Sequence, residues 1–305
     1  MTIGRGERRM ERPAVVERRQ RTPSEAGEGG RRDSSGAWCR PPERLELADG
    51  EVHVWRARLG NPCRLPPAAR SWLSHDEKQR ARRFVFDVDR ERYETHRCLL
   101  RMLLSRYLGV LPEDIRLKEN ARSKPALQTT DGGPTLEFNA SHCGGLAVYA
   151  FAWRRRVGID VERVRPGWSD RSIAERFFSR GEVRALRALP VHHQEAAFFA
   201  AWTRKEALLK ALGFGLSEDL AAFDVSVDPQ GPAAVLDARG PLRAARKFWL
   251  TDFVPATGYR GCLAVAGRPV GVTCWDWSAA GGHGGDWGGH LDELAVVQTP
   301  RSGGG

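Results

Sequence analysis

Val-Gly-Ile-Asp-Val-Glu, residues 157–162 of a 305-residue chain, is the stretch on which the fold and its chemistry depend. In a β-strand, successive side chains point to opposite faces. Asp160 and Glu162 would therefore share one face, while Ile159 and Val161 pack on the other. A solvated strand edge with two exposed carboxylates would leave the same pattern.

A second segment, residues 202–210, reads Trp-Thr-Arg-Lys-Glu-Ala-Leu-Leu-Lys and ends a predicted helix over residues 193–212. The turns before it, residues 196–201, contain only Ala and Phe, which predicts a buried helix. Glu206 lies on the stripe of Trp202, so its carboxylate would sit beside a buried indole. The alternative is an exposed pair of Glu206 with Lys210 on an amphipathic helix.

If Glu206 faces Asp160 and Glu162, three carboxylates share one site, and their repulsion raises the pKa of at least one of them. A hard divalent cation removes that repulsion. Mg²⁺ suits an incomplete set of oxygen ligands, because it keeps positions for water and for phosphate oxygens of a substrate. The carboxylates therefore predict a metal and phosphate site with a lysine nearby.

A third segment, residues 138–145, reads Phe-Asn-Ala-Ser-His-Cys-Gly-Gly and leads into an apolar run. Its polar side chains and two glycines offer hydrogen-bond donors and close backbone approach, as a phosphate clamp needs. A Ser-His pair alone is more often loop surface. Upstream, Lys124 precedes a proline in an extended turn.

Apolar periodicity elsewhere predicts a mixed chain. Strands are expected at 51–59, 146–153, 157–161, 223–227, 248–254 and 263–265, and helices at 89–108, 170–189 and 193–212. Residues 146–153 and 157–161 are expected to form a hairpin. The predicted fold class is α+β, with two lobes meeting near residue 157.

The expected domains follow from composition and from these elements. They are a disordered Arg/Gly/Pro-rich extension at 1–45, an N-terminal lobe at 46–156, a C-terminal lobe at 157–277 and a weakly ordered Gly-rich tail at 278–305.

The net charge of +10 suggests a polyanionic partner, which could be a nucleic acid, a phosphorylated cofactor or an acidic protein. Six cysteines without a Cys-x-x-Cys pair indicate neither a zinc site nor a disulfide framework. The longest apolar run is too short to span a bilayer, and we expect a cytoplasmic protein.

Five segments in one collinear order resemble the 4'-phosphopantetheinyl transferase superfamily, specifically its longer, surfactin-type branch, which forms a pseudo-dimer in one chain. They are Lys-Pro at 124–125, Asn-x-Ser-His at 139–142, Gly-Ile-Asp-x-Glu at 158–162, Arg-Phe-Phe-Ser at 176–179 and Trp-x-x-Lys-Glu-Ala-x-x-Lys at 202–210. The resemblance implies two similar lobes, each a small, mostly antiparallel sheet packed with a long helix. Coenzyme A would bind in the cleft between them.

The implied activity is transfer of 4'-phosphopantetheine from coenzyme A to a serine of an apo acyl, polyketide or peptidyl carrier protein, with Mg²⁺, releasing 3',5'-ADP. By the same resemblance Asp160, Glu162 and Glu206 are the metal ligands, and Glu206 is our choice for the general base. The protein would be a monomer that activates carrier proteins in secondary metabolite biosynthesis, without nucleic-acid or membrane partners.

The resemblance also assigns phosphate contacts. Lys205, assigned as catalytic together with Glu206, and Lys210 would approach the pyrophosphate. Ser141 and His142 would contact coenzyme A phosphates, and Lys124 and Arg97 would hold the adenylate end. Relatives with a Lys-x-x-Lys pair before the first helix bind the 3'-phosphate with it. Here those positions carry Glu77 and Arg80, and Arg80 can substitute, because arginine grips phosphate at least as well.

Two rival interpretations stay open on the sequence. A basic nucleic-acid-binding protein would use the arginine-rich termini, with the acidic residues incidental, and its binding would depend steeply on salt. A metal-dependent phosphodiesterase would keep the fold and the metal but transfer nothing to a protein. A predicted helix at 172–189 carries four arginines that suit an acidic carrier, at positions Arg176, Arg180, Arg184 and Arg187.

Overall fold

The fold is described from a computed structural model, in which residues 38–60, 65–119, 124–128, 135–165, 171–214 and 219–278 are placed. Most of the predicted N-terminal extension and almost all of the Gly-rich tail lie outside the described residues.

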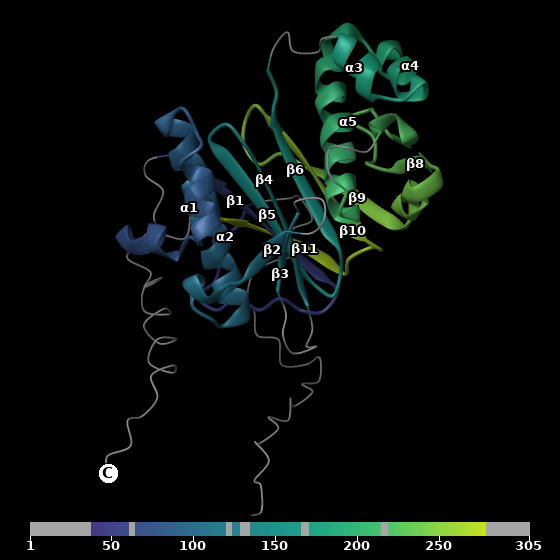
Figure 1. Ribbon diagram of the computed structural model, residues 1–305. Helices are drawn as coiled ribbons and strands as arrows, with labels where there is room; N and C mark the ends of the chain where they lie inside the picture. The colour runs from purple at the N-terminus through teal and green to yellow at the C-terminus, as the bar shows by residue number, and fades with distance from the viewer. Residues whose placement is uncertain are drawn as a thin grey trace, which may run out of the picture. The chain divides into compact units, whose positions relative to one another are not determined.

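In the N-terminal part of the chain, helices α1 and α2 lie together on one side of the strands (Figure 1). In order, these elements are β1 (Glu51–Arg58), α1 (His75–Ala81), α2 (Asp87–Leu108), β2 (Leu117–Glu119), β3 (Pro125–Leu127), β4 (Leu136–Cys143) and β5 (Leu146–Trp153).

The C-terminal part repeats this mixture of strands and helices. Its elements are β6 (Val157–Arg163), α3 (Arg171–Phe177), α4 (Arg180–Ala188), α5 (Val191–Leu212), β7 (Phe223–Val225), β8 (Val235–Ala238), β9 (Phe248–Phe253), β10 (Tyr259–Ala266) and β11 (Gly271–Asp276). Short 3-10 helices lie at Pro67–Trp72, Pro112–Asp114, Leu220–Ala222 and Gly240–Lys247. The chain is α+β, as predicted.

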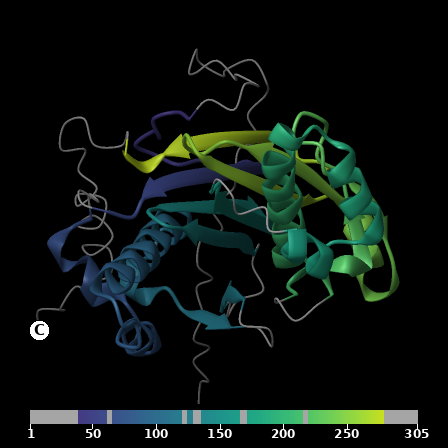
Figure 2. The same ribbon diagram turned by 90° about the horizontal axis from the view of Figure 1, so that it is seen from above.

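Two sheets lie between the two long helices (Figure 2). One has the strand order β11-β1-β5-β4 and the other β6-β10-β9. Helix α2 shares an apolar core with the outer face of the first sheet, and α5 with the outer face of the second. A third core joins the inner faces, with Val54, Val148, Ile159 and Val265 among its members. The period-two alternation of the strands therefore sends one face to a helix and the other to the facing sheet.

The predicted hairpin of residues 146–153 and 157–161 is wrong. β5 pairs with β1 and β4, whereas β6 pairs with β10, so the three arginines between β5 and β6 lead from one sheet to the other. The predicted C-terminal lobe also needs correction, because β11 pairs parallel with β1 in the N-terminal sheet. Strand pairing across such sequence separations leaves no trace in local periodicity.

Helix ends follow the local chemistry. Gly109 and Gly213 have left-handed backbone conformations directly after α2 and α5, as glycines that end helices commonly do. The single helix expected at 170–189 is two helices, because Ser179 starts a capping box with Glu182 at that point. No helix within the described ranges is both long and apolar enough to cross a membrane.

Candidate active site

Three polar side chains meet where β4, β6 and α5 come together. The Lys210 ammonium lies 2.6 Å from Asp160 Oδ1 and donates to Ser141 Oγ at 2.9 Å. The Ser141 hydroxyl in turn donates to the same Asp160 oxygen at 2.9 Å. Asp160 is only 4 % exposed, so this carboxylate is desolvated and depends on its two partners.

Two neighbouring residues explain how these elements approach so closely. Gly158 lets α5 lie directly on β6, since a Cβ at Gly158 would fall 2.1 Å from the carbonyl oxygen of Ala207. The side-chain oxygen of Asn139 accepts a hydrogen bond of 2.8 Å from the backbone N–H of Ile159. This bond joins β4 to β6 and thereby holds Ser141 opposite Asp160.

Glu206 lies on α5, one turn before Lys210, and its carboxyl group is buried at 7 % exposure. Burial raises the pKa of Glu206 to about 7, and the nearby charge of Asp160 adds to the shift. Burial and Asp160 also raise the pKa of Glu162. Clustered carboxylates are expected to raise one another's pKa in this way.

The donor set fits a hard cation in part. Asp160 Oδ2 and Glu206 Oε1 are buried, and neither has a hydrogen-bond partner among the described residues. Such oxygens are costly to bury unless a cation or water satisfies them. As they stand, however, the described side chains include no group of three His, Cys, Asp or Glu residues arranged to hold a metal. A cation would therefore need Glu162 to turn toward the other two carboxylates.

His142 follows Ser141 on β4 and packs its ring against that of His96, with 4.7 Å between ring centroids. Burial lowers the pKa of His142, and the charges of Lys210 and Arg80 lower it further. His96 is itself fixed by Tyr149, whose hydroxyl lies 3.0 Å from the His96 Nδ1. This packing sets the orientation of the His142 ring.

The Lys124 ammonium lies at the end of α5, where it donates to the carbonyl oxygens of Lys210 at 2.7 Å and Val157 at 3.2 Å. Burial lowers the pKa of Lys124 to about 8. Lys124 therefore links the segment before β3 to the helix that carries Lys210, beside the predicted phosphate site.

Arg97 on α2 binds Glu77 through its Nε at 2.6 Å, and Arg101 binds the other oxygen of Glu77 at 2.8 Å. Glu77 thus holds two arginines and also completes the capping box with Ser74 that starts α1. Arg80, a turn further along α1, is exposed, with its guanidinium 5.9 Å from the centre of the Tyr93 ring.

The expectation that Lys205 approaches the pyrophosphate has to be corrected. Its fully buried ammonium pairs with Glu182 at 2.8 Å and donates to the carbonyl oxygens of Leu220 and Phe223. These partners lie in the core between α5 and α4, away from Asp160. Adjacent residues on a helix diverge by about 100°, so Lys205 and Glu206 cannot serve the same site.

Lys205→Met is expected to destabilise the fold by about 3–5 kcal/mol, because it leaves the Glu182 carboxylate buried without its cation. Adding Glu182→Gln should restore part of the loss. The free energy of unfolding in urea measures both, with the exposed Lys247→Met as the control, expected within about 0.5 kcal/mol of wild type. A fully stable Lys205→Met protein that has lost its activity would instead support a catalytic role.

Three residues support the site in ways that their sequence context does not predict. Glu77 and Glu182 both carry a sequence signal, because each stands three residues after a serine in the Ser-x-x-Glu pattern of a capping box. Their second function, pairing with buried cations, has no such signal. Asn139 lay inside a quoted motif, but its role as a bridge between β4 and β6 depends on tertiary contact.

Acidic and basic groups converge on one buried point, close to the histidine of β4. Such a combination suits an enzyme that acts on phosphate groups. Residues 66–153 match the family described as 4'-phosphopantetheinyl transferase, N-terminal, and residues 156–264 match the 4'-phosphopantetheinyl transferase superfamily.

Known proteins agree with these matches. The chain is 37 % identical over 230 residues to the 4'-phosphopantetheinyl transferase HetI of a Nostoc species, covering 75 % of this chain and 94 % of that protein. It is 32 % identical over 165 residues to the transferase Sfp of Bacillus subtilis, covering 54 % and 71 %. Among solved structures, the Thermotoga maritima holo-[acyl-carrier-protein] synthase matches 37 % of this chain and 62 % of its own, with 22 % identity and a TM-score of 0.28.

The chain belongs to the 4'-phosphopantetheinyl transferase family, and the implied enzyme class is confirmed.

Proposed function

We propose that this enzyme takes 4'-phosphopantetheine from coenzyme A and attaches it to a serine of an apo acyl, polyketide or peptidyl carrier protein. The observation that carries the proposal is the convergence of Lys210, Ser141, Asp160 and Glu206 at one buried point in a member of this family. Such a point combines fixed positive charge for a pyrophosphate with carboxylates able to take a proton or bind a cation.

In the proposed reaction the acceptor serine oxygen forms a bond to the β-phosphorus of coenzyme A. The bond from that phosphorus to the bridging oxygen breaks, and 3',5'-ADP leaves with that oxygen. Glu206 accepts the serine proton, and Lys210 offsets charge on the phosphates. His142, Arg97 and Arg80 are proposed to contact the nucleotide end of coenzyme A. Lys124 is proposed to lie there too, and it also donates to the backbone carbonyl oxygen of Lys210.

Asp160, Glu162 and Glu206 would hold Mg²⁺, and the two buried oxygens without a partner among the described residues support this assignment. When bound, the cation would stabilise charge on the pyrophosphate. A bound cation also lowers the pKa of the carboxylates around it. The base role of Glu206 is therefore proposed from its position beside Lys210 and Asp160, and not from its raised pKa.

The proposed organisation is a pseudo-dimer within one chain, with each lobe a helix on a sheet and coenzyme A between the lobes. We take the N-terminal lobe as 46–156 together with β11, and the C-terminal lobe as 157–270. The protein is proposed to work as a cytoplasmic monomer that activates carriers of secondary metabolism, with no nucleic-acid or membrane partner. Acidic carriers are proposed to dock on the arginine-bearing helices α3 and α4.

Incubation of an apo carrier protein with coenzyme A, Mg²⁺ and the enzyme should add about 340 Da to the carrier, as one phosphopantetheine group in a metal-dependent transfer. Intact-protein mass spectrometry measures the gain, and excess chelator should abolish it. A carrier whose serine is replaced by alanine is the control.

The same experiment separates the rival activities. Cleavage of coenzyme A without any gain in carrier mass would indicate a phosphodiesterase. No gain with acyl, polyketide and peptidyl carriers alike would refute the proposed acceptor class.

A further inference from the structure

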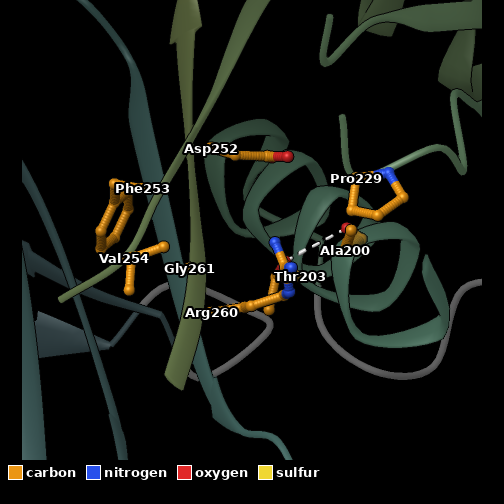
Figure 3. Close-up of a pocket in the computed structure, with 8 residues that line it drawn as sticks. All are labelled: Ala200, Thr203, Pro229, Asp252, Phe253, Val254, Arg260 and Gly261. Carbon is orange, nitrogen blue, oxygen red and sulfur yellow. Dashed lines mark hydrogen bonds between the residues drawn. The ribbon is translucent and has the colours of Figure 1, made fainter. Parts of the chain in front are cut away.

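A pocket of about 140 Å³ lies on the side of β10 that faces α5 (Figure 3). The wall from α5 is formed by Ala200 and Thr203, and the opposite wall by the ends of β9 and β10. Its lining residues are Ala200, Thr203, Pro229, Asp252, Phe253, Val254, Arg260 and Gly261. The volume suits one amino-acid side chain rather than a nucleotide.

The pocket borders the candidate active site. Arg260 is the direct cross-strand partner of Glu162, and such partners have Cβ atoms about 4.5–5.5 Å apart. On the helix side, Thr203 stands three residues before Glu206, so the two are neighbours on the surface of α5. A ligand group in the pocket would therefore lie next to the elements that carry the carboxylates.

The charges in the pocket are not balanced. Asp252 is already bound by the buried Arg204, whose Nε lies 3.1 Å from Asp252 Oδ1. Arg260 is half-buried and reaches across the pocket toward Thr203 (Figure 3), without a hydrogen bond or ion pair to any described residue. Among the described residues, the Arg260 guanidinium therefore faces the pocket without an ion-pair partner.

We infer that this pocket, with Arg260 as its charged group, is a subsite for an acidic side chain of the acceptor protein next to the serine that is modified. The inference rests on the proposed function, which brings an acidic protein segment to this site. A guanidinium binds a carboxylate through parallel hydrogen bonds, and Ala200 and Thr203 form the α5 wall beside it.

The position of the pocket favours the acceptor over the donor. The groups proposed for the nucleotide, His142 and Lys124, lie on the β4 side of β6, whereas the pocket lies on the opposite, β10 side. The pantetheine chain of coenzyme A is uncharged beyond its phosphates, so it gives no counter-charge to Arg260. An acidic side chain beside the reactive serine does.

The test uses the full chain, coenzyme A and an apo acyl carrier protein that the wild-type enzyme modifies. Arg260→Glu should raise the KM for the carrier about tenfold and leave kcat within about twofold. The Kd for coenzyme A, measured by calorimetry, should not change. Arg260→Gln, which keeps the size of the side chain, should give a smaller rise in KM.

Charge exchange identifies the contact. Carrier variants in which single acidic residues near the serine become lysine should lose turnover with wild type, and one of them should regain it with Arg260→Glu. Arg163→Glu is the matched control, because Arg163 is exposed on the neighbouring strand and points to the other face of the sheet.

An unchanged carrier KM for Arg260→Glu would overturn the inference, as would a weakened affinity for coenzyme A, which would assign the pocket to the pantetheine chain. Absence of transfer by the wild-type enzyme would instead refute the proposed function, and the subsite would fall with it.

Discussion

Glu206→Gln is expected to lower the rate of phosphopantetheine transfer by at least about 100-fold, the usual effect of losing a general base. The substitution keeps the shape of the side chain but removes both its negative charge and its ability to take a proton. Because Glu206 Oε1 has no hydrogen-bond partner among the described residues, the substitution breaks no hydrogen bond to that oxygen. The thermal midpoint should therefore stay close to that of wild type.

The control for Glu206→Gln is Glu195→Gln, which lies on the same helix about 16 Å away along its axis. Single-turnover assays give the transfer rate, and calorimetry with Mg²⁺ gives the metal affinity of each protein. Glu206→Gln should weaken Mg²⁺ binding, whereas Glu195→Gln should change neither quantity. A rate within a few-fold of wild type would remove Glu206 from the reaction.

The fold was predictable where local patterns decide it. The apolar face of α2 and the all-apolar turns of α5 gave both long helices, because a buried helix must carry such a face. Strand pairing was not predictable, because β11 pairs with β1 although more than two hundred residues separate them in the sequence. The supposed hairpin of β5 and β6 failed for the same reason: its turn residues permit a reversal but do not determine which strands pair.

The candidate site was predictable where the spacing of residues along a strand or helix decides which side chains lie together. Strand alternation predicted that Asp160 and Glu162 share one face, and helical spacing predicted that Glu206 lies near Lys210. The structure brings Asp160 and Lys210 into contact. Lys205 shows the limit of this reasoning. Two lysines five residues apart in one motif have different surroundings. Lys210 faces β6, whereas Lys205 faces the buried Glu182, and no rule of residue spacing predicts that pair.

Gly158→Ala is expected to destabilise the fold by about 3 kcal/mol or more, among the largest effects of any single methyl group in this chain. The new Cβ would lie 2.1 Å from the carbonyl oxygen of Ala207 and 2.3 Å from the backbone nitrogen of Ala211. Both are backbone atoms of α5, so no side-chain rotation relieves the overlap. The helix has to move away from β6.

That displacement would also separate Lys210 from Asp160, since the two side chains meet across the same contact of α5 with β6. Urea unfolding gives the loss of stability, and transfer assays on the folded fraction give the loss of activity. The control is Gly145→Ala, where an added Cβ meets nothing within 4 Å, and stability should stay within about 0.5 kcal/mol of wild type. If Gly158→Ala were as stable and active as Gly145→Ala, close contact between α5 and β6 could not be what assembles the site.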